Sequence, residues 1–111
     1  SFGVTAYELA ALGVPALYLC LTEDHALSAS AFERAGMGVS LGLGDEVTEA
    51  AIAQAVSSLL ADPARRRAMG AAGRMNVDGR GAARIAAHIQ RLIAERSEAL
   101  SVTDAKAAIA V

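Results

Sequence analysis

The residues best suited to chemistry lie near the beginning of the chain. The segment Gly3-Val-Thr-Ala-Tyr-Glu8 places a glycine, a hydroxyl group and a carboxylate within six residues. A helix that begins there presents free backbone N–H groups, and these groups and the helix dipole favour a bound anion such as phosphate. Gly3 permits close approach of a phosphate oxygen, and Glu8 can accept two hydrogen bonds from ribose hydroxyl groups. Gly3, Val4, Thr5 and Glu8 are therefore candidate residues for binding a nucleoside diphosphate.

Thr5 and Glu8 also have a purely structural interpretation. They fit a capping box, in which the Thr5 hydroxyl accepts a hydrogen bond from the N–H of Glu8 and the Glu8 side chain bonds back to the N–H of Thr5. Thr5 can combine capping with ligand binding, whereas the two roles compete for Glu8. The capping box predicts a helix over residues 6–12, which Gly13 and Pro15 would end.

A second group of polar residues follows an apolar run. Residues 16–21, Ala-Leu-Tyr-Leu-Cys-Leu, show no polar alternation, which predicts a strand covered on both faces, as in a parallel sheet. Ligands of open α/β sheets bind beyond the carboxyl ends of the strands. Asp24, His25 and Ser28 follow this strand and are candidates for contact with a ligand. Alternatively, Asp24 caps the next helix and His25 lies in a solvated loop.

The rest of the pattern predicts a helix-rich α/β fold with a Rossmann-like βαβ layer. A helix over residues 26–35, stopped by Gly36, and a short strand over residues 39–41 should make a right-handed parallel unit with the first strand. Further helices are expected over residues 48–61, 63–72 and 81–96, with Asp62 as an N-cap and residues 74–79 as a turn. Two strands do not complete such a sheet, so we expect a fragment. A missing N-terminal domain or self-association would then supply the neighbouring strand.

Composition excludes several classes of protein. Hydrophobic residues make up 54% of the chain and charged residues 20%, with a net charge of −2, which argues against disorder and against a nucleic-acid-binding groove. Cys20, the single cysteine, is expected to be buried, and the chain can form no internal disulfide. His25 and His88 are the only histidines, and no metal site or cofactor is predicted. The apolar runs are too short for a membrane span, no signal peptide is recognisable, and we expect a cytoplasmic location. Residues 65–67, Arg-Arg-Arg, are typical of a solvated helix face.

The segment from Gly3 to Pro15 also resembles a known motif. It matches Gly-x-(Ser/Thr)-x-x-Glu-x-x-x-x-Gly-x-Pro, the signature of GT-B glycosyltransferases of the family 28 type, which include the peptidoglycan N-acetylglucosaminyl transferase. The resemblance implies that the chain is part of a GT-B C-terminal domain that holds UDP. In that case Gly3 and Thr5 match the diphosphate turn and Glu8 matches the ribose-binding glutamate.

A second motif narrows the resemblance to one branch. Residues 77–86, Val-Asp-Gly-Arg-Gly-Ala-Ala-Arg-Ile-Ala, are similar to the Asp-Gly-x-Gly-Ala-x-Arg-Ile stretch of the UDP-sugar hydrolases of pseudaminic-acid biosynthesis and of related spore-coat polysaccharide proteins. The hydrolases cleave UDP-2,4-diacetamido-2,4,6-trideoxy-beta-L-altropyranose. Where they usually carry Asn-Gln, at positions that face the sugar, this chain has Asp24-His25. The resemblance thus implies that Asp24, His25 and Ser28 contact the sugar or the diphosphate. Their catalytic base lies in the N-terminal domain, so no catalytic residue is assigned to this chain, which we expect to be inactive by itself.

The leading hypothesis is thus the UDP-binding C-terminal part of a UDP-sugar hydrolase in bacterial nonulosonic-acid or surface polysaccharide biosynthesis. Residues 1–96 would form the partial nucleotide-sugar-binding domain, and residues 97–111 a C-terminal tail. UDP or a UDP-sugar is the expected partner. Two alternatives stay open: the donor-binding domain of a family 28-type glycosyltransferase, and a noncatalytic α/β interaction fragment.

Overall fold

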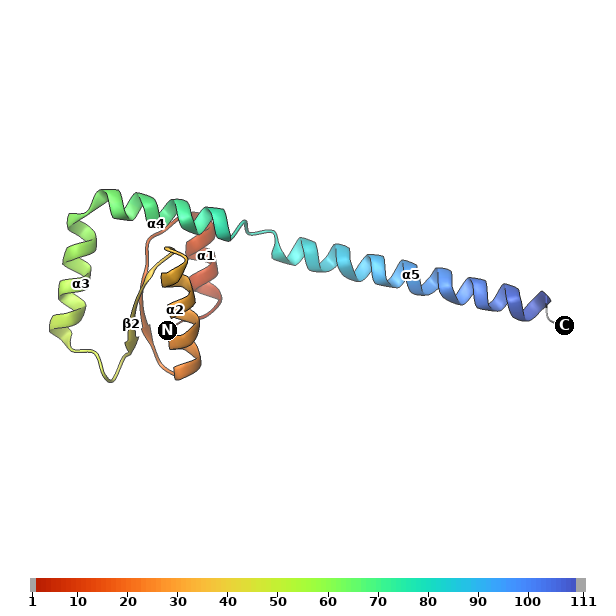
Figure 1. The fold of residues 1–111 in the computed structure, drawn as a ribbon, viewed down its shortest axis with the longest axis horizontal. Coiled ribbons are helices and arrows are strands. Elements are labelled where there is room, and N and C mark those ends of the chain that lie inside the picture. Colours follow the sequence, from red (N-terminus) through yellow and green to blue (C-terminus); the bar gives the residue numbers. More distant parts are fainter. Residues whose placement is uncertain (1, 110–111) are drawn as a thin grey trace. The chain divides into compact units, whose positions relative to one another are not determined.

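Two parallel strands and the helices around them form the first of two units, which ends at Gly79 (Figure 1). The computed structural model describes residues 2–109. The predicted helix-rich α/β class with a parallel strand pair is confirmed. In chain order the elements are α1 (Val4–Leu12), β1 (Leu17–Cys20), α2 (Glu23–Arg34), β2 (Val39–Leu43), α3 (Glu49–Ala61), α4 (Pro63–Asn76) and α5 (Gly81–Ile109).

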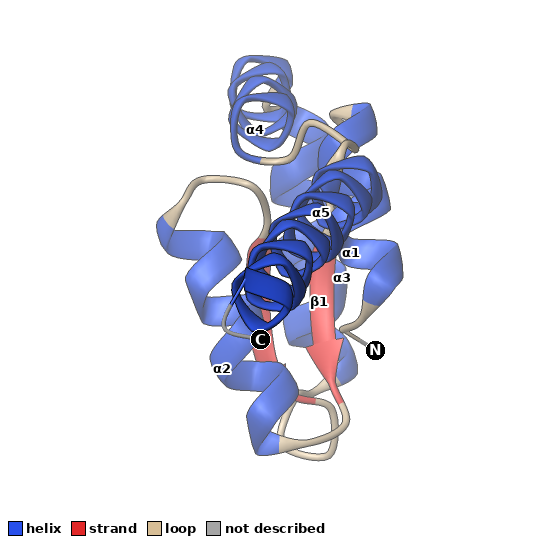
Figure 2. Cartoon of the chain, turned by 90° about the vertical axis from the view of Figure 1, so that its right-hand side faces the viewer, coloured by secondary structure: helices blue, strands red, loops and turns tan. Residues whose placement is uncertain are grey.

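The two strands lie side by side in parallel (Figure 2), as the βαβ pattern predicts. Tyr18 pairs with Ser40, and Cys20 pairs with Leu43, so β2 holds one more residue than β1 between these pairs. Gly42 lies in this interval with a φ of 86°, a conformation that glycine adopts without strain. The strand is therefore longer than the predicted 39–41, because a glycine absorbs the irregularity instead of ending the pairing.

One face of the strand pair is buried more deeply than the other. Tyr18 and Cys20 point toward α1 and α2 and are 4% and 0% exposed, whereas Leu17 and Leu19 on the opposite face are only half-buried. In the described part of the chain each strand has a neighbour on one edge only. The prediction that both faces of β1 are covered therefore holds, in the described residues, only for the face that packs against α1 and α2.

The four aromatic residues of the chain form one cluster on the buried face. The Phe2 ring lies edge-on to Tyr18 and Phe32, with centroid distances of 5.1 and 4.8 Å, and Tyr7 meets Phe32 at 4.9 Å. Because aromatic rings carry large apolar areas, these contacts tie α1, β1 and α2 into one core. The remaining core side chains around the cluster are small or flexible: Ala6, Ala10, Ala16, Cys20, Ala29 and Met37.

Glycines end the first two helices as predicted. Gly13 has a φ of 72°, its N–H bonds to the Ala10 carbonyl at 2.9 Å, and the next N–H bonds to Leu9 at 2.8 Å. Gly36 ends α2 in the same way, with a φ of 74°. This pattern satisfies carbonyl groups that the helix leaves without partners, and it reverses the chain after each helix.

The junction between α3 and α4 also follows the prediction. Asp62 caps α4 by accepting a hydrogen bond from the Arg65 N–H at 2.8 Å, and Pro63 is the first helical residue. However, α4 continues to Asn76, so the predicted turn at residues 74–79 is wrong over its first three residues. Gly73 does not end this helix, because it lies at the contact with α1, where only a residue without a side chain fits.

The second unit, from Arg80 onward, contains α5. This helix begins at Gly81 as predicted, but it runs to Ile109 instead of ending near residue 96. Residues 97–109 are rich in alanine, which favours a helix even where apolar periodicity is weak. The division into residues 1–96 and a tail of residues 97–111, whose last two residues lie outside the described part, stays a prediction. Within residues 2–109, no helix is sufficiently long and apolar to cross a membrane.

Candidate functional site

The first predicted site segment lies at the amino end of α1. Gly3 is the N-cap, with an extended backbone, and Val4 and Thr5 are the first two helical residues. The predicted capping box is therefore wrong: the helix begins two residues earlier than expected, and the N-cap provides no side-chain hydrogen bond. The burial of Phe2 in the aromatic cluster fixes the chain just before this start. Ser1, the first residue of the predicted turn, lies outside the described residues.

This start leaves backbone N–H groups open at the end of α1. The first N–H groups of a helix have no acceptor within it, and here the cap supplies none to Val4 and Thr5. The third, Ala6, bonds to the Gly3 carbonyl at 2.9 Å. No acidic residue stands in the first turn, and a Cβ atom at Gly3 would meet nothing within 4 Å. The helix end therefore combines a positive dipole, open donors and free space.

Glu8 lies one turn further along the same helix. Because Glu8 is four residues after Val4, both side chains project from the same side of α1. Its carboxylate is exposed and makes no hydrogen bond or ion pair with the described part of the chain. Since capping does not occupy it, Glu8 is free to accept hydrogen bonds from a ligand.

The second predicted segment lies at the amino end of α2, which differs from that of α1. Thr22 caps this helix, its hydroxyl oxygen accepting a hydrogen bond from the His25 N–H at 3.3 Å, so the alternative interpretation of Asp24 as the cap is wrong. Glu23 and Asp24 occupy the first turn, where their carboxylates already face the positive end of the dipole. An anionic group is therefore favoured at α1 and disfavoured at α2.

His25 has the most unusual environment among the predicted site residues. Its side chain is half-buried, and its Nδ1 atom is shielded from solvent without a hydrogen-bond partner within residues 2–109. Buried polar atoms are seldom left unpaired, so the hydrogen bonding of His25 is incomplete within the described residues. Asp24 and Ser28 are exposed and lie four residues apart, on the same side of α2.

The structure holds both segments on one body without joining them. Phe2, just before α1, packs on Tyr18, while the turn after Gly13 leads into the start of β1, so α1 and β1 run in opposite directions. The amino ends of α1 and α2 thus both face the carboxyl end of β1. No hydrogen bond or ion pair links the two sets of residues in the described part of the chain. Whether they share one ligand stays a prediction.

The aromatic residues that position both segments were not recognised as a unit from sequence. The signal was present: Phe2, Tyr7, Tyr18 and Phe32 are all the aromatic residues of the chain, and they lie in its first 32 positions. Burial raises the pKa of Tyr18, and its hydroxyl group has no partner among the described residues. In residues 2–109, no three histidine, cysteine or acidic side chains gather where they could hold a metal ion.

Comparison with known proteins shows two distant relatives. The chain is 32% identical over 90 residues to the spore coat polysaccharide biosynthesis protein SpsG of Bacillus subtilis (strain 168). The aligned region covers 81% of this chain and 26% of SpsG. It is 39% identical over 74 residues to the UDP-N-acetylglucosamine--N-acetylmuramyl-(pentapeptide) pyrophosphoryl-undecaprenol N-acetylglucosamine transferase of Rhodopseudomonas palustris (strain BisB18). Here the aligned region covers 63% of this chain and 20% of that enzyme.

These similarities bear out the coarser part of the predicted resemblance. The chain is similar both to a spore coat polysaccharide protein and to an N-acetylglucosamine transferase, the two groups that the motifs indicated. It spans about a quarter or less of the length of these relatives. No family model and no solved structure matches the chain. The narrower assignment to the pseudaminic-acid hydrolases stays a prediction.

Proposed function

We propose that the first unit of this chain binds the UDP group of a nucleotide sugar. The observation that carries the proposal is the open amino end of α1. Val4 and Thr5 offer N–H groups without a capping side chain, Gly3 leaves space beside them, and Glu8 offers a carboxylate without a partner in the described residues. This arrangement suits a diphosphate at the helix end and a ribose one turn further along.

The protein that contains this unit is, in this proposal, a UDP-sugar hydrolase of bacterial nonulosonic-acid or surface polysaccharide biosynthesis. Hydrolysis replaces the bond between sugar and diphosphate with a bond to the oxygen of water, and negative charge develops on the departing diphosphate. The N–H groups of Val4 and Thr5 would stabilise this charge. Asp24, His25 and Ser28 would contact the sugar or the diphosphate. The name of SpsG, a spore coat polysaccharide biosynthesis protein, supports the polysaccharide context.

A family 28-type glycosyltransferase is the second candidate, favoured by the 39% identity to the N-acetylglucosamine transferase. Both candidates bind the donor in the same way and differ in what accepts the sugar. Incubation of the whole protein with UDP-sugar, with and without an acceptor, separates them. Free sugar in both reactions supports the hydrolase, and sugar attached only when the acceptor is present supports the transferase.

Binding of UDP by the chain itself is tested by calorimetry and by amide chemical shifts. We expect shifts at residues 3–8 and 22–28, and Glu8→Ala should weaken binding by about 1–3 kcal/mol, because a charged hydrogen-bond acceptor is lost. Glu98→Ala is the matched control, since Glu98 is also exposed on a helix and lies in the second unit. The ribose role of Glu8 is wrong if both variants bind UDP equally. The absence of any shift favours the noncatalytic interaction fragment.

A further inference from the structure

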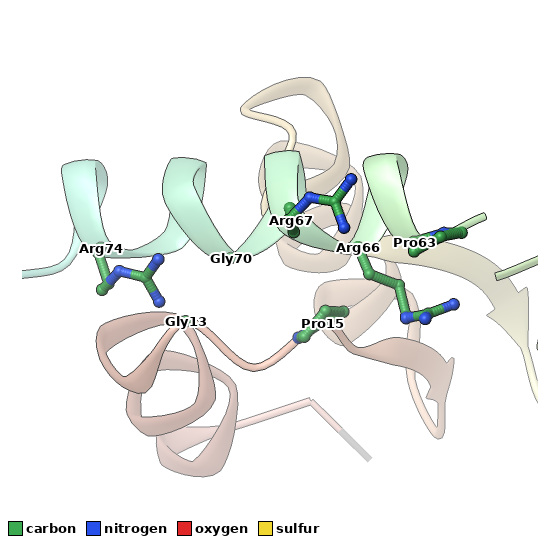
Figure 3. Close-up of a pocket in the computed structure, with 7 residues that line it drawn as sticks. All are labelled: Gly13, Pro15, Pro63, Arg66, Arg67, Gly70 and Arg74. Atoms are coloured by element: carbon green, nitrogen blue, oxygen red, sulfur yellow. The ribbon is translucent and has the colours of Figure 1, made fainter. Parts of the chain in front are cut away.

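A cavity of about 460 Å³ lies between α4 and the turn that joins α1 to β1 (Figure 3). Three arginine side chains of α4 line one wall, and no acidic side chain is among the lining residues. The residues that line it are Gly13, Pro15, Pro63, Arg66, Arg67, Gly70 and Arg74. A concentration of three positive charges in a chain with a net charge of −2 is a local feature that the overall composition does not predict.

The spacing of the arginines explains why they line the same cavity. Arg66, Gly70 and Arg74 are separated by four residues each, so they share one side of α4, with Arg67 beside them (Figure 3). The run of three arginines at residues 65–67 predicts a solvated helix face. That interpretation is wrong for Arg66, which is half-buried and lines the cavity with its neighbour.

Arg66 is held in place by the preceding helix. Its Nη1 atom donates hydrogen bonds to the carbonyl oxygens of Leu59, at 2.7 Å, and of Leu60. These carbonyls lie in the last turn of α3 and lack N–H donors within the helix. The guanidinium group is thus oriented before any ligand arrives, which lowers the entropy lost on binding.

Arg67 and Arg74 keep their donors available. Neither makes an ion pair or a hydrogen bond with side chains in the described part of the chain, and guanidinium groups stay charged at all physiological pH values. An anion bound in the cavity would accept charge-assisted hydrogen bonds from them.

The opposite wall is backbone that packs closely against α4. Gly13 has no side chain, and the Arg74 guanidinium group lies directly against it, so any side chain at position 13 would displace Arg74. Gly70 faces the Gly13 carbonyl, where an added Cβ atom would lie 2.5 Å from the oxygen. Apart from the arginines, the residues that line the cavity are therefore glycines and prolines, with no bulky side chain among them.

This cavity is separate from the UDP site proposed above. Gly13 and Pro15 precede the amino end of β1, whereas the amino ends of α1 and α2 face the carboxyl end of that strand. The two sites therefore lie at opposite ends of β1 and share no residue. Binding at one can be measured without assuming binding at the other.

We propose that this cavity binds a small, multiply charged anion of the phosphate class, with inorganic pyrophosphate as its simplest probe. Arg66 provides a fixed donor, while Arg67 and Arg74 close on the anion from the surface of α4. Pyrophosphate offers several anionic oxygens in a small volume, which matches guanidinium geometry better than a monovalent anion does.

The experiment titrates the full chain with pyrophosphate at constant ionic strength and follows arginine side-chain and backbone NMR signals. We expect saturable shifts at Gly13, Gly70 and the three arginines, and tighter binding of pyrophosphate than of chloride. In calorimetry, the double variant Arg67→Gln with Arg74→Gln should bind pyrophosphate at least about tenfold more weakly. If the double variant does not fold, Arg67→Gln alone serves, because Arg67 is exposed and makes no hydrogen bond or ion pair with the described residues.

Arg96→Gln is the matched control, since Arg96 is an exposed helical arginine of the second unit. If Arg96→Gln weakens pyrophosphate binding as much as the cavity variants do, binding depends only on the net charge of the chain, and the proposed cavity site is wrong. Shifts confined to residues 3–8 and 22–28 would overturn it as well, because pyrophosphate would then occupy the proposed UDP site alone. A linear, unsaturated response to pyrophosphate would also overturn it. Titration with UDP in parallel identifies which site each anion prefers.

Discussion

Gly73 of α4 lies against the backbone of Ala10 in α1. A Cβ atom at position 73 would come within 2.5 Å of the Ala10 carbonyl oxygen, a distance that real Cβ atoms do not adopt. Gly70, one turn earlier, lies equally close to the Gly13 carbonyl. The two glycines let α4 approach α1 closely, and α1 is the helix that carries the proposed diphosphate site.

The replacement Gly73→Ala should therefore destabilise the first unit. Alanine favours a helix by about 1 kcal/mol relative to glycine, but the added methyl group meets backbone atoms that have no room to move. We expect the free energy of unfolding to fall by about 1–3 kcal/mol, as for other overpacked sites. Denaturant unfolding followed by circular dichroism measures this change.

Gly81→Ala is the control for this prediction. A Cβ atom at Gly81 would meet nothing within 4 Å, so only the helix preference of alanine acts there. Its stability should stay unchanged or rise slightly. If Gly73→Ala is as stable as Gly81→Ala, the inference that α1 and α4 pack too closely for a side chain at position 73 is wrong.

Two threonines near helix starts should respond differently to alanine. Thr22 caps α2 through its hydroxyl oxygen, so Thr22→Ala should lower the free energy of unfolding by about 1 kcal/mol. Thr5 lies inside α1 and caps nothing, so Thr5→Ala should leave stability nearly unchanged. Thermal unfolding of both variants tests the assignment. A larger loss for Thr5→Ala would restore the capping box that the structure contradicts.

Helix ends were predicted well where glycine or proline defines them. Gly13, Gly36 and the pair Asp62-Pro63 each impose a local backbone geometry that does not depend on the rest of the fold. The start of α1 was predicted two residues too late. The reason is tertiary: burial of Phe2 against β1 and α2 fixes the chain before Gly3, and the sequence pattern contains no local sign of this contact.

The candidate site was predictable in its residues but not in its environment. Gly3 and Glu8 could be selected because glycine near a helix start and a carboxylate one turn later have recognisable chemistry. The arginine cavity could not, because it requires α4 to pack on the turn at Gly13, a contact between residues more than 50 positions apart. Local patterns carry no information on such contacts.

Tyr18 predicts a measurable dependence of stability on pH. Burial raises the pKa of its hydroxyl group above the ordinary value of 10.0, because the charged form is poorly solvated in the core. Above pH 10.0 the unfolded chain loses this proton before the folded chain does, so stability falls as the pH rises. Below pH 10.0 both states keep the proton and the effect disappears.

Tyr18→Phe isolates this contribution. The variant lacks the ionisable group, so the part of the stability loss above pH 10.0 that comes from Tyr18 should vanish. At neutral pH its stability should equal or exceed that of the original chain, since the removed hydroxyl group has no partner among the described residues. Urea unfolding at neutral pH and above pH 10.0 measures both effects. Parallel losses in the two proteins would contradict the prediction.

Asp24 predicts an effect of charge on UDP binding, provided that the proposed function is right. Its carboxylate lies in the first turn of α2, exposed and beside the carboxyl end of β1. A diphosphate bound nearby would be repelled by it, and Asp24→Asn removes the charge at nearly constant volume. Because interactions near helix ends contribute about 0.3–1 kcal/mol, UDP affinity should rise about two- to fivefold in calorimetry. Glu23→Gln removes one charge from the same turn and is the control. An equal gain of affinity in both variants indicates a general effect of negative charge at this helix end. A gain confined to Asp24→Asn indicates that the phosphate lies beside Asp24.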